Sequence, residues 1–308
     1  MNILVAEYAS ALGMGGTCER EGRAMLSVLV ESFERSGNNV AYPTHGPKIK
    51  AGDYILVDDQ ADFQDLLEAI MVDAALLIAP DDLQPRFLKI IEERRRTANL
   101  GCDPDVARLC ADKLLCTERL KDAGVPVAEI VHAPEPCERG CHRYVIKPRY
   151  GCGSEGVRIS SFVRTGQNEI ATRYHEGLHL SASFIVGRER FLPLTINRQL
   201  IEFKEDGMSY EGSQVPYLTP RADEIWEAAR KAAAALGLRG YAGIDFVLGD
   251  LPRAVDVNAR PTTSIIGIAK VMQEEIGELI LQARFGELPK RVHVERTTKF
   301  RKKDLMSR

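Results

Sequence analysis

The segment 143–160, RYVIKPRYGCGSEGVRIS, carries glycines at positions 151, 153 and 156, the spacing G-x-G-x-x-G of a dinucleotide-binding turn. Such a turn needs a helix directly after the glycines, because the helix N-terminus holds the pyrophosphate. The residues after Gly156 are VRISSFVR, which alternate in polarity and include β-branched side chains, so they predict a strand. Glu176 stands near the distance of the acidic residue in a dinucleotide site, but without the helix it lacks that setting. The segment therefore predicts strand, loop and strand, and the dinucleotide interpretation is rejected.

A glycine-rich loop between antiparallel strands suits the phosphates of a nucleotide. Small residues let backbone N–H groups approach phosphate oxygens, and Ser154 adds a hydroxyl donor. Lys147 stands just ahead, at the end of an apolar strand, where it supplies a point charge. A plain glycine hairpin turn is the alternative that this segment alone leaves open.

The segment 243–264, GIDFVLGDLPRAVDVNARPTTS, has the pattern of a hairpin that carries acidic residues. With a turn centred on residues 250 and 251, Asp245 faces Asp256. Asn258 shares their face, because side chains alternate with period two along a strand. Facing carboxylates repel one another unless a cation lies between them, and Mg²⁺ bound to a triphosphate fits this set of oxygens best. Arg260 follows on the same face, where it can meet the charge that develops as a phosphoryl group moves. Two solvated aspartates on an exposed face are the alternative.

The composition is that of a soluble globular protein, with 44% hydrophobic and 28% charged residues in a chain of 308. This length predicts two or three packed units rather than one core. The net charge of −3 gives no electrostatic reason to expect nucleic acid as a partner. The sequence shows neither the apolar length of a membrane-spanning helix nor the pattern of a signal peptide. Seven scattered cysteines are typical of reduced thiols, so we expect a cytoplasmic protein.

Apolar strands (2–6, 54–59 and 74–80) alternate with amphipathic helices (18–37 and 62–73) up to about residue 100, which predicts a small open α/β sheet. The rest of the chain is mainly strand-like, with predicted helices over 103–124, 222–238 and 265–286. The predicted strands of this second part are 125–133, 143–150, 156–164, 179–187 and the two arms of the hairpin. The basic ending, 296–308, is interpreted as a solvated terminal segment rather than an arm for an anionic surface.

Several features occur in an order that resembles the ATP-grasp superfamily: Lys113, Lys147-Pro148, GCGSEGV (151–157), EGLHLSAS (176–183), GIDFVL (243–248) and DVNARPTTS (256–264). The resemblance implies an α/β and α+β protein with an ATP-grasp fold. Its expected parts are an N-terminal open α/β (pre-ATP-grasp) domain over 1–108, a central subdomain over 109–172 and a C-terminal subdomain over 173–308. It also implies an ADP-forming ligase that joins a carboxylate to an amine or thiol through an acyl phosphate, with ATP between the two subdomains.

The resemblance also implies a role for each matching position. It gives ATP contacts to Lys113 and Lys147, and catalytic roles to Lys147 and Arg260. The phosphate lid would consist of Gly151, Gly153, Ser154 and Gly156. The backbone of Arg173, Tyr174 and His175 would bind adenine, and Asp245, Asp256 and Asn258 would hold Mg²⁺ or Mn²⁺. Two positions depart from the family: His179 replaces the usual ribose-binding glutamate, for which Glu176 is a substitute, and Asp256 stands where glutamate is commoner.

Within the superfamily, four shorter segments most resemble archaeal tyramine–glutamate ligases of methanofuran biosynthesis: EYAS (7–10), EREGRAML (19–26), LLIAPDD (76–82) and NLGCDPDVARLCADK (99–113). This resemblance implies that the side-chain carboxylate of glutamate is phosphorylated and that the amine of tyramine attacks it. Glu7, at a strand end, could pair an ammonium, but helix capping or solvent exposure is favoured over that role. Three alternatives stay open: another ATP-grasp amino-acid ligase, a small-molecule kinase that acts on a hydroxyl, and a nucleotide-binding regulator without chemistry. The oligomeric state is equally open, with a homodimer among the choices.

Cysteines and histidines gather between positions 132 and 142, but the spacing H-x4-C-x3-C-H matches no usual pair of zinc ligands. We therefore expect unrelated surface and core residues there, with a Cys137–Cys141 disulfide only in a hyperthermophile. Cys152 lies within the predicted lid, and Trp226 is expected to be a packing residue.

Overall fold

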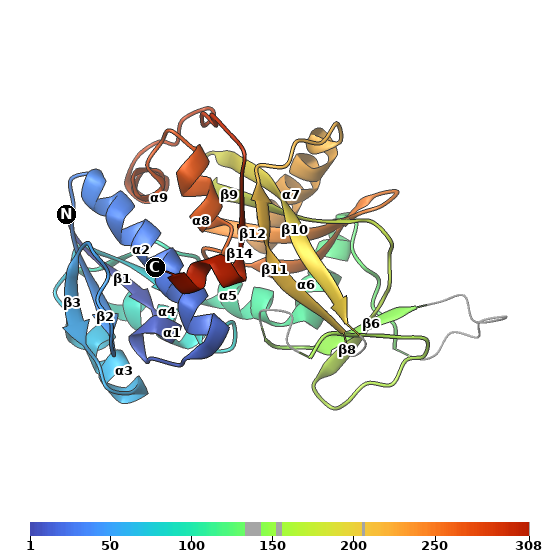
Figure 1. Cartoon of the computed structure of the whole chain (residues 1–308), viewed down its shortest axis with the longest axis horizontal. Coiled ribbons are helices and arrows are strands. Elements are labelled where there is room, and N and C mark those ends of the chain that lie inside the picture. Colours follow the sequence, from blue (N-terminus) through green and yellow to red (C-terminus); the bar gives the residue numbers. More distant parts are fainter. Residues whose placement is uncertain (133–142, 152–155, 205–206, 308) are drawn as a thin grey trace.

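The computed structural model describes residues 1–132, 143–151, 156–204 and 207–307 (Figure 1). The N-terminal part forms a five-stranded parallel sheet in the order β3-β2-β1-β4-β5. Its strands are β1 (Asn2–Glu7), β2 (Asn39–Thr44), β3 (Asp53–Leu56), β4 (Ala74–Ile78) and β5 (Ala98–Asn99). β1 and β4 are apolar and buried, as strands in the middle of a parallel sheet are, whereas β3 is a largely exposed edge. The predicted open α/β sheet is therefore confirmed.

The helices of this part are α1 (Tyr8–Ala11), α2 (Gly16–Arg35), α3 (Gln60–Ala69) and α4 (Gln84–Glu93). α2 buries the stripe that its periodicity predicts, made of Met25, Leu26, Leu29, Val30 and Phe33. Glu7 caps α1, since its carboxylate accepts hydrogen bonds from the N–H groups of Ala9 and Ser10 at 3.2 and 2.7 Å. Of the roles considered for Glu7, the structure shows helix capping, which was among the favoured ones.

The single helix predicted over 103–124 is wrong, because the chain breaks at Asp112 into α5 (Pro104–Ala111) and α6 (Lys113–Asp122). Asp112 has extended backbone angles, φ −85° and ψ 95°, and its carboxylate accepts hydrogen bonds from two N–H groups in the first turn of α6. The same carboxylate accepts from the guanidinium of Arg149 at 2.8 and 2.7 Å and from the hydroxyl of Tyr150 at 2.8 Å. These contacts stabilise the break and place Lys113 at the start of α6.

The central sheet is three-stranded and antiparallel, in the order β7-β6-β8. β6 (Tyr144–Pro148) and β7 (Arg158–Ser160) flank the glycine segment, and β8 (Glu169–Arg173) pairs with the other edge of β6. The predicted sequence of strand, loop and strand is confirmed. The strand predicted over 125–133 is wrong in its described part, where Val127 and Ile130 form isolated bridges.

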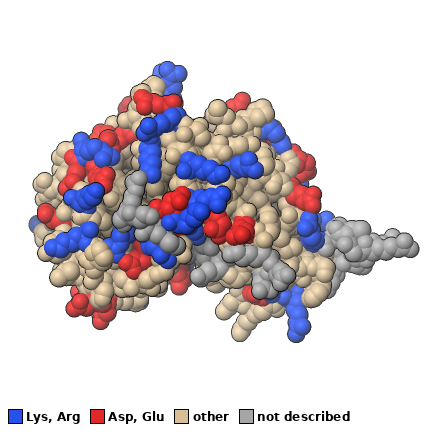
Figure 2. All heavy atoms as spheres, viewed as in Figure 1, with Lys and Arg blue, Asp and Glu red and all other residues tan. Residues whose placement is uncertain are grey.

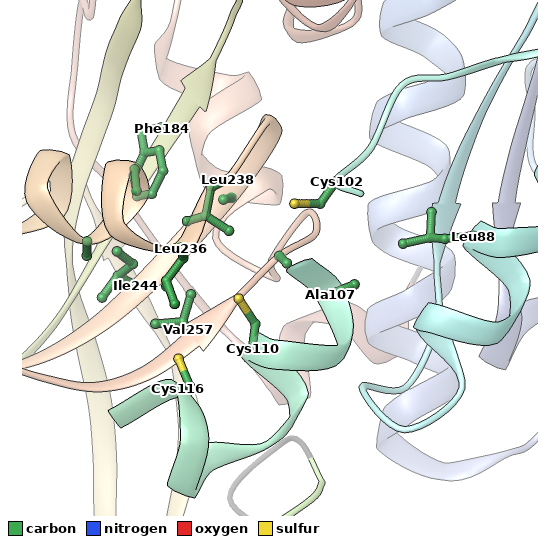
Figure 3. Packing of buried hydrophobic residues seen from close by; sticks show 14 of the residues in the cluster. Leu88, Cys102, Ala107, Cys110, Cys116, Phe184, Leu236, Leu238, Ile244 and Val257 are labelled. Atoms are coloured by element: carbon green, nitrogen blue, oxygen red, sulfur yellow. The ribbon is translucent and has the colours of Figure 1, made fainter. Parts of the chain in front are cut away.

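The C-terminal part is built on a six-stranded antiparallel sheet in the order β13-β12-β9-β10-β11-β14. Its strands are β9 (Leu178–Val186), β10 (Phe191–Lys204), β11 (Gly207–Val215), β12 (Gly240–Leu248), β13 (Pro252–Asn258) and β14 (Thr298–Arg301). α7 (Ala222–Leu236) packs against β9, β10 and β13, and its Trp226 contacts the ring of Phe191, as expected of a packing residue. α5 and α6 also contact β13, where Cys110, Cys116 and Val257 belong to one buried cluster (Figure 3).

A second buried cluster joins this sheet to α2, α8 (Ile265–Val271) and α9 (Ile276–Phe285). Because α8 and α9 are separate helices, the single helix predicted over 265–286 is wrong. Glu275, between the two helices, accepts hydrogen bonds from Ser32 at 2.6 Å and from Arg35 at 2.7 Å. Gly277 lies so close to α2 that an added Cβ would meet Phe33 at 2.8 Å. Contacts with α2 decide this break, which the helical periodicity of the segment does not reveal.

The basic ending is not the solvated segment that the sequence predicts. β14 pairs with β11, and Phe300 is 5% exposed in the second cluster. Lys302, in the 3₁₀ helix η1 (Lys302–Ser307), forms an ion pair with Glu21 of α2 at 2.7 Å. The ending therefore links the C-terminal sheet to the N-terminal domain.

Charged side chains are mixed on the surface. On the face seen in Figure 2, Lys and Arg lie interspersed with Asp and Glu, in keeping with a net charge of −3. None of the helices formed by the described residues combines the length and apolar character that crossing a lipid bilayer requires.

Two phenylalanines test the docking of the C-terminal ending, because Phe300 is 5% exposed and Phe162 is 61% exposed. Phe300→Ala is expected to lower the free energy of unfolding by about 3 kcal/mol, since it leaves a cavity beneath β14. Phe162→Ala, the matched control, is expected to change it by less than about 0.5 kcal/mol. Urea denaturation followed by circular dichroism measures both values, and equal effects would contradict a docked ending.

Candidate active site

Two lysines converge on the hairpin formed by β12 and β13. Lys113, the first residue of α6, donates a hydrogen bond to Oδ1 of Asp256 at 2.8 Å. Lys147, in β6, donates to the carbonyl oxygen of Val255 at 2.6 Å. Both lysine side chains are buried. The structure thus brings the two predicted nucleotide lysines and the acidic hairpin to one place.

The hairpin pairs Asp245 with Asp256, as predicted, although its turn differs from the predicted one. Leu248 pairs with Pro252, which leaves three residues in the loop instead of two. A bulge at Val255 then adds one residue to β13 and restores the expected pairing. The extra residue of a bulge is left unpaired in the ladder, and the carbonyl of Val255 accepts from Lys147 instead.

The two aspartates differ in their electrostatic surroundings. Burial, followed by the charge of Asp256, raises the pKa of Asp245 to about 7, although a hydrogen bond with Gln199 and the charges of both lysines oppose the rise. Burial acts on Asp256 in the same direction, but the ammonium groups of Lys113 and Lys147 outweigh it and lower the pKa of Asp256. Burial in turn lowers the pKa of Lys147 to about 8. Without further positive charge, Asp245 therefore takes up a proton near neutral pH.

The oxygen atoms of this hairpin suit a divalent cation. Asn258 pairs with Gly243, so its side chain lies on the same face as Asp245 and Asp256. Two carboxylates and one amide oxygen are hard ligands, and the raised pKa of Asp245 indicates that added positive charge would be stabilised there. Among the described residues, no group of three or more His, Cys, Asp and Glu side chains is placed to hold a metal by itself. Two carboxylates and one amide oxygen would fill only part of the six-oxygen shell that Mg²⁺ prefers, and nucleotide phosphates could supply further ligands.

Arg260 lies on the loop after β13 and forms a salt bridge with Asp81, which follows β4. Its Nε and Nη2 atoms donate to Oδ1 of Asp81 at 3.0 and 2.9 Å, and the side chains of Arg260 and Asp81 are only 12% and 10% exposed. The charge of Arg260 also helps to lower the pKa of Asp256, after the larger effects of burial and the two lysines. Arg260 therefore lies within electrostatic range of the acidic hairpin.

The segment predicted to bind adenine begins at the end of β8. The N–H groups of Arg173 and Tyr174 each donate at 2.9 Å within the chain, to the carbonyl oxygens of Glu129 and Arg143. The next residue, His175, is half-buried, and burial, together with the charge of Arg253, lowers its pKa. Adenine recognition by this segment would accordingly use its carbonyl oxygens and the N–H of His175. The roles of Arg173 and His175 stay predictions.

The two candidates for the ribose contact lie in different surroundings. His179 pairs with Val247 across β9 and β12, which places it on the same face of the sheet as Asp245. Burial lowers the pKa of His179, and its ring lies 5.9 Å from that of Phe203. The side chain of Glu176 is 81% exposed and forms an ion pair with Arg143 at 2.6 Å. His179 is the better placed of the two, although its contact with ribose remains a prediction.

The ends of the predicted phosphate lid adopt conformations that favour glycine. Gly151 and Gly156 have φ angles of 132° and 69°. A Cβ at Gly156 would also come within 3.0 Å of the ring of Pro148. The other lid residues, Cys152, Gly153 and Ser154, lie outside the described residues, as do Cys137, Cys141 and His142.

Comparison with known proteins gives the family of this chain. Residues 110–264 match the family described as the ATP-grasp domain. The tyramine–L-glutamate ligase of Methanocaldococcus fervens is 32% identical over 297 residues, which cover 91% of this chain and 93% of that protein. The chain belongs to the ATP-grasp family. Its family and its similarity to this relative together show that the protein is an ATP-dependent carboxylate–amine ligase that forms ADP.

Solved structures agree with the ATP-grasp fold predicted from the sequence. An ATP-grasp superfamily protein from Archaeoglobus fulgidus superposes with a TM-score of 0.77 at 24% identity, over 98% of this chain and 92% of that one. N5-carboxyaminoimidazole synthetase from Staphylococcus aureus, complexed with ADP, has a TM-score of 0.71 at 15% identity, over 96% of this chain and 80% of that one. At these identities the likeness shows the fold alone.

Sequence reasoning missed three residues of this ATP-grasp site: Asp81, Asp112 and Gln199. Asp112 had a usable signal, since it directly precedes Lys113 and aspartate is a preferred N-cap residue. Gln199 lies on β10, for which the sequence pattern predicts no strand. The pairing of Asp81 with Arg260 had no signal in the sequence, because 179 residues separate the two.

The pKa of Asp245 predicts how stability depends on pH in the protein without metal and nucleotide. Its value of about 7 lies above that of an unfolded aspartate, about 4, so its protonated form stabilises the fold fully below about pH 4. This contribution is lost as the pH rises through about 7. Asp245→Asn keeps the neutral form, so it is expected to stabilise the protein more at pH 8 than at pH 4, by on the order of 4 kcal/mol.

Denaturant unfolding in the presence of a chelator, at both pH values, measures this difference. Asp65→Asn, which removes an exposed carboxylate from α3, is the matched control and is expected to act alike at both. A pH-independent effect of Asp245→Asn would show that Asp245 is ionised throughout.

Proposed function

We propose that this ATP-grasp ligase joins the side-chain carboxylate of glutamate to the amine of tyramine. One observation carries the proposal: the relative named tyramine–L-glutamate ligase matches 91% of this chain and 93% of its own length. The ATP-grasp domain match spans 110–264, so the similarity to this relative extends well beyond it. The proposal therefore does not rest on nucleotide-binding residues alone.

The residues of the site suit ATP with a divalent cation. Lys113 and Lys147 would contact the phosphates, and their positive charge already concentrates around the acidic hairpin. Asp245, Asp256 and Asn258 would hold Mg²⁺, with Mn²⁺ as an alternative. Mg²⁺, when bound, supplies positive charge to the phosphates and to both aspartates.

The proposed reaction has two displacements. First, a carboxylate oxygen of glutamate attacks the γ-phosphorus of ATP, so an O–P bond forms, ADP leaves and an acyl phosphate results. Arg260 and Lys147 stabilise the charge on the transferred phosphoryl group. The neutral amine nitrogen of tyramine then attacks the acyl carbon, phosphate leaves, and the nitrogen loses a proton as the amide forms. Water must be excluded from the acyl phosphate, which we assign to the lid between Gly151 and Gly156.

The same assignment carries three further proposals. We propose that the reaction belongs to methanofuran biosynthesis and that the protein lies in the cytoplasm. A homodimer is proposed as the alternative to a monomer, and sedimentation velocity would decide between them.

The substrates are tested by ADP release with each combination of acid and amine. ADP is expected with glutamate and tyramine together, and much less with either alone, because the acyl phosphate turns over only when an amine attacks it. Mass spectrometry of the product is expected to show the amide. ADP formation without amine, with a stable phosphorylated product, would instead identify a kinase. Absence of ADP with all acid–amine pairs would indicate a nucleotide-binding regulator.

Two substitutions test the site residues. Lys147→Ala and Asp256→Ala are each expected to lower the rate of ADP release at least about 100-fold, because Lys147 supplies positive charge to the phosphates and Asp256 is a proposed ligand of the cation that binds them. Lys231→Ala and Asp65→Ala alter exposed residues of α7 and α3, and they serve as matched controls with unchanged rates. Circular dichroism verifies that all four variants fold. A near-normal rate in either site variant would show that the altered residue has another role.

A further inference from the structure

We infer that Asp81 is a positioning residue, which holds the guanidinium of Arg260 in the orientation used for phosphoryl transfer. The inference rests on the proposed function, in which Arg260 acts on the transferred phosphoryl group. Two hydrogen bonds carry it, because Nε and Nη2 of Arg260 both donate to Oδ1 of Asp81, at 3.0 and 2.9 Å. The partners lie 179 residues apart in the chain and belong to different domains.

Asp81 stands at the place where an open parallel sheet forms a binding crevice. From β1 the chain adds β2 and β3 on one side of the sheet, and then β4 and β5 on the other. The boundary between β1 and β4 is therefore the topological switch point, and ligands of open α/β sheets usually bind at the carboxyl ends of such strands. Asp81 follows β4, and Glu7 ends β1 at the same edge.

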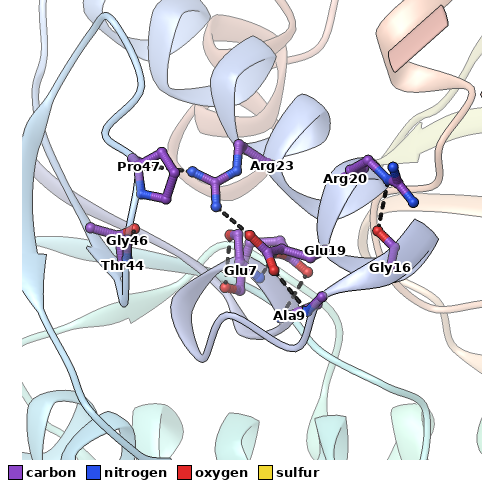
Figure 4. Close-up of polar contacts among 11 residues, drawn as sticks. Glu7, Ala9, Gly16, Glu19, Arg20, Arg23, Thr44, Gly46 and Pro47 are labelled. Carbon is purple, nitrogen blue, oxygen red and sulfur yellow. Dashed lines mark hydrogen bonds and ion pairs between the residues drawn. The ribbon is translucent and has the colours of Figure 1, made fainter. Parts of the chain in front are cut away.

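Arg260 brings positive charge to this edge of the sheet. Burial raises the pKa of Glu7, and Arg260 lies close enough to oppose that rise. Glu7 itself is committed to capping α1, as Figure 4 shows, and an added Cβ on Gly22 of α2 would meet its carboxylate at 2.2 Å. Glu7 is therefore fixed in place, whereas Asp81 bonds directly to Arg260.

The backbone around Asp81 is held by its own hydrogen bonds. The N–H groups of Leu83 and Gln84 both donate to the carbonyl of Pro80, at 3.0 and 2.8 Å. The side chain of Gln84 accepts from the N–H of Ala79 at 2.8 Å and is buried. A carboxylate on this closed turn can fix one edge of a planar guanidinium, since the Nε and Nη2 donors lie on the same side.

The pair is also enclosed. The side chains of Arg260 and Asp81 are 12% and 10% exposed, and together with Gln84, Cys110 and Ala259 they line a small pocket between α5 and the loop after β13. Charges interact strongly where water is scarce, so an unpaired guanidinium would be unfavourable here. An arginine held in one orientation needs little reorganisation when charge develops on the phosphoryl group. The N-terminal domain thereby takes part in a step whose ATP contacts come from the other subdomains.

Asp81→Asn tests the inference in the full-length protein, because asparagine keeps the size of the side chain and removes its charge. The kcat for ADP release is expected to fall about 10- to 100-fold, while the KM for ATP changes less than about twofold. This split is expected because Asp81 acts on the orientation of Arg260 and not on nucleotide affinity. Asp82→Asn removes the charge of the exposed neighbour and serves as the matched control, with both constants unchanged.

A double-mutant cycle separates positioning from general stability. If Asp81 acts through Arg260, then adding Asp81→Asn to Arg260→Ala causes no further loss of kcat. If the losses of kcat in the two single variants multiply in the double variant, the inference is overturned. An unchanged kcat in Asp81→Asn, when Arg260→Ala is impaired, overturns it as well. Neither result bears on the proposed function. An Arg260→Ala variant with normal turnover overturns the role of Arg260 in the proposed function and the inference with it. Thermal unfolding of each variant shows whether a loss of kcat follows from a loss of fold, which would also overturn the inference.

Discussion

The facing carboxylates of Asp245 and Asp256 are the constraint on which the rest of the site depends. Adjacent strands bring two acids together, and their repulsion must be offset within the protein or by a ligand. The fold brings positive charge to them from Lys113 at the start of α6, from Lys147 in β6 and from Arg260 after β13. Since these cations come from separate elements, the acidic hairpin also holds those elements together electrostatically.

Elements with a local signal could be predicted from the sequence, and those decided by distant contacts could not. Alternation and glycines predicted the strands around the lid, and apolar periodicity predicted α2 and its buried stripe. Periodicity also ran through Asp112 and Glu275, where capping and contacts with α2 break the helices. The ending around Phe300 has a basic composition, which predicts exposure to solvent. The burial of Phe300 and the pairing of β14 with β11 were therefore not predicted.

The same distinction applies to the site. The pairing of Asp245 with Asp256 was predicted from a regular hairpin with alternating side chains. The structure reaches the same pair by a longer turn and a bulge at Val255, whose effects on the register cancel. The bulge provides the carbonyl that Lys147 binds, so it is a part of the site that a regular hairpin would lack. Asp81 lay beyond reach because the salt bridge to Arg260 follows from how the N-terminal sheet packs against the loop after β13.

The arrangement is poor for stability and suited to binding. A buried carboxylate with a pKa near 7 and a buried lysine with a pKa near 8 each cost free energy, and apolar side chains at these positions would avoid that cost. Asp112, by contrast, is satisfied by Arg149, Tyr150 and the start of α6, and its pKa is lowered. The buried charges without full compensation thus include those on the face of the hairpin that carries Asp245. A cation and a polyphosphate together would offset them, because the cation compensates the aspartates and the phosphates compensate the lysines. The incomplete compensation of charge within the chain therefore supports the proposal that a metal ion and a nucleotide bind here together.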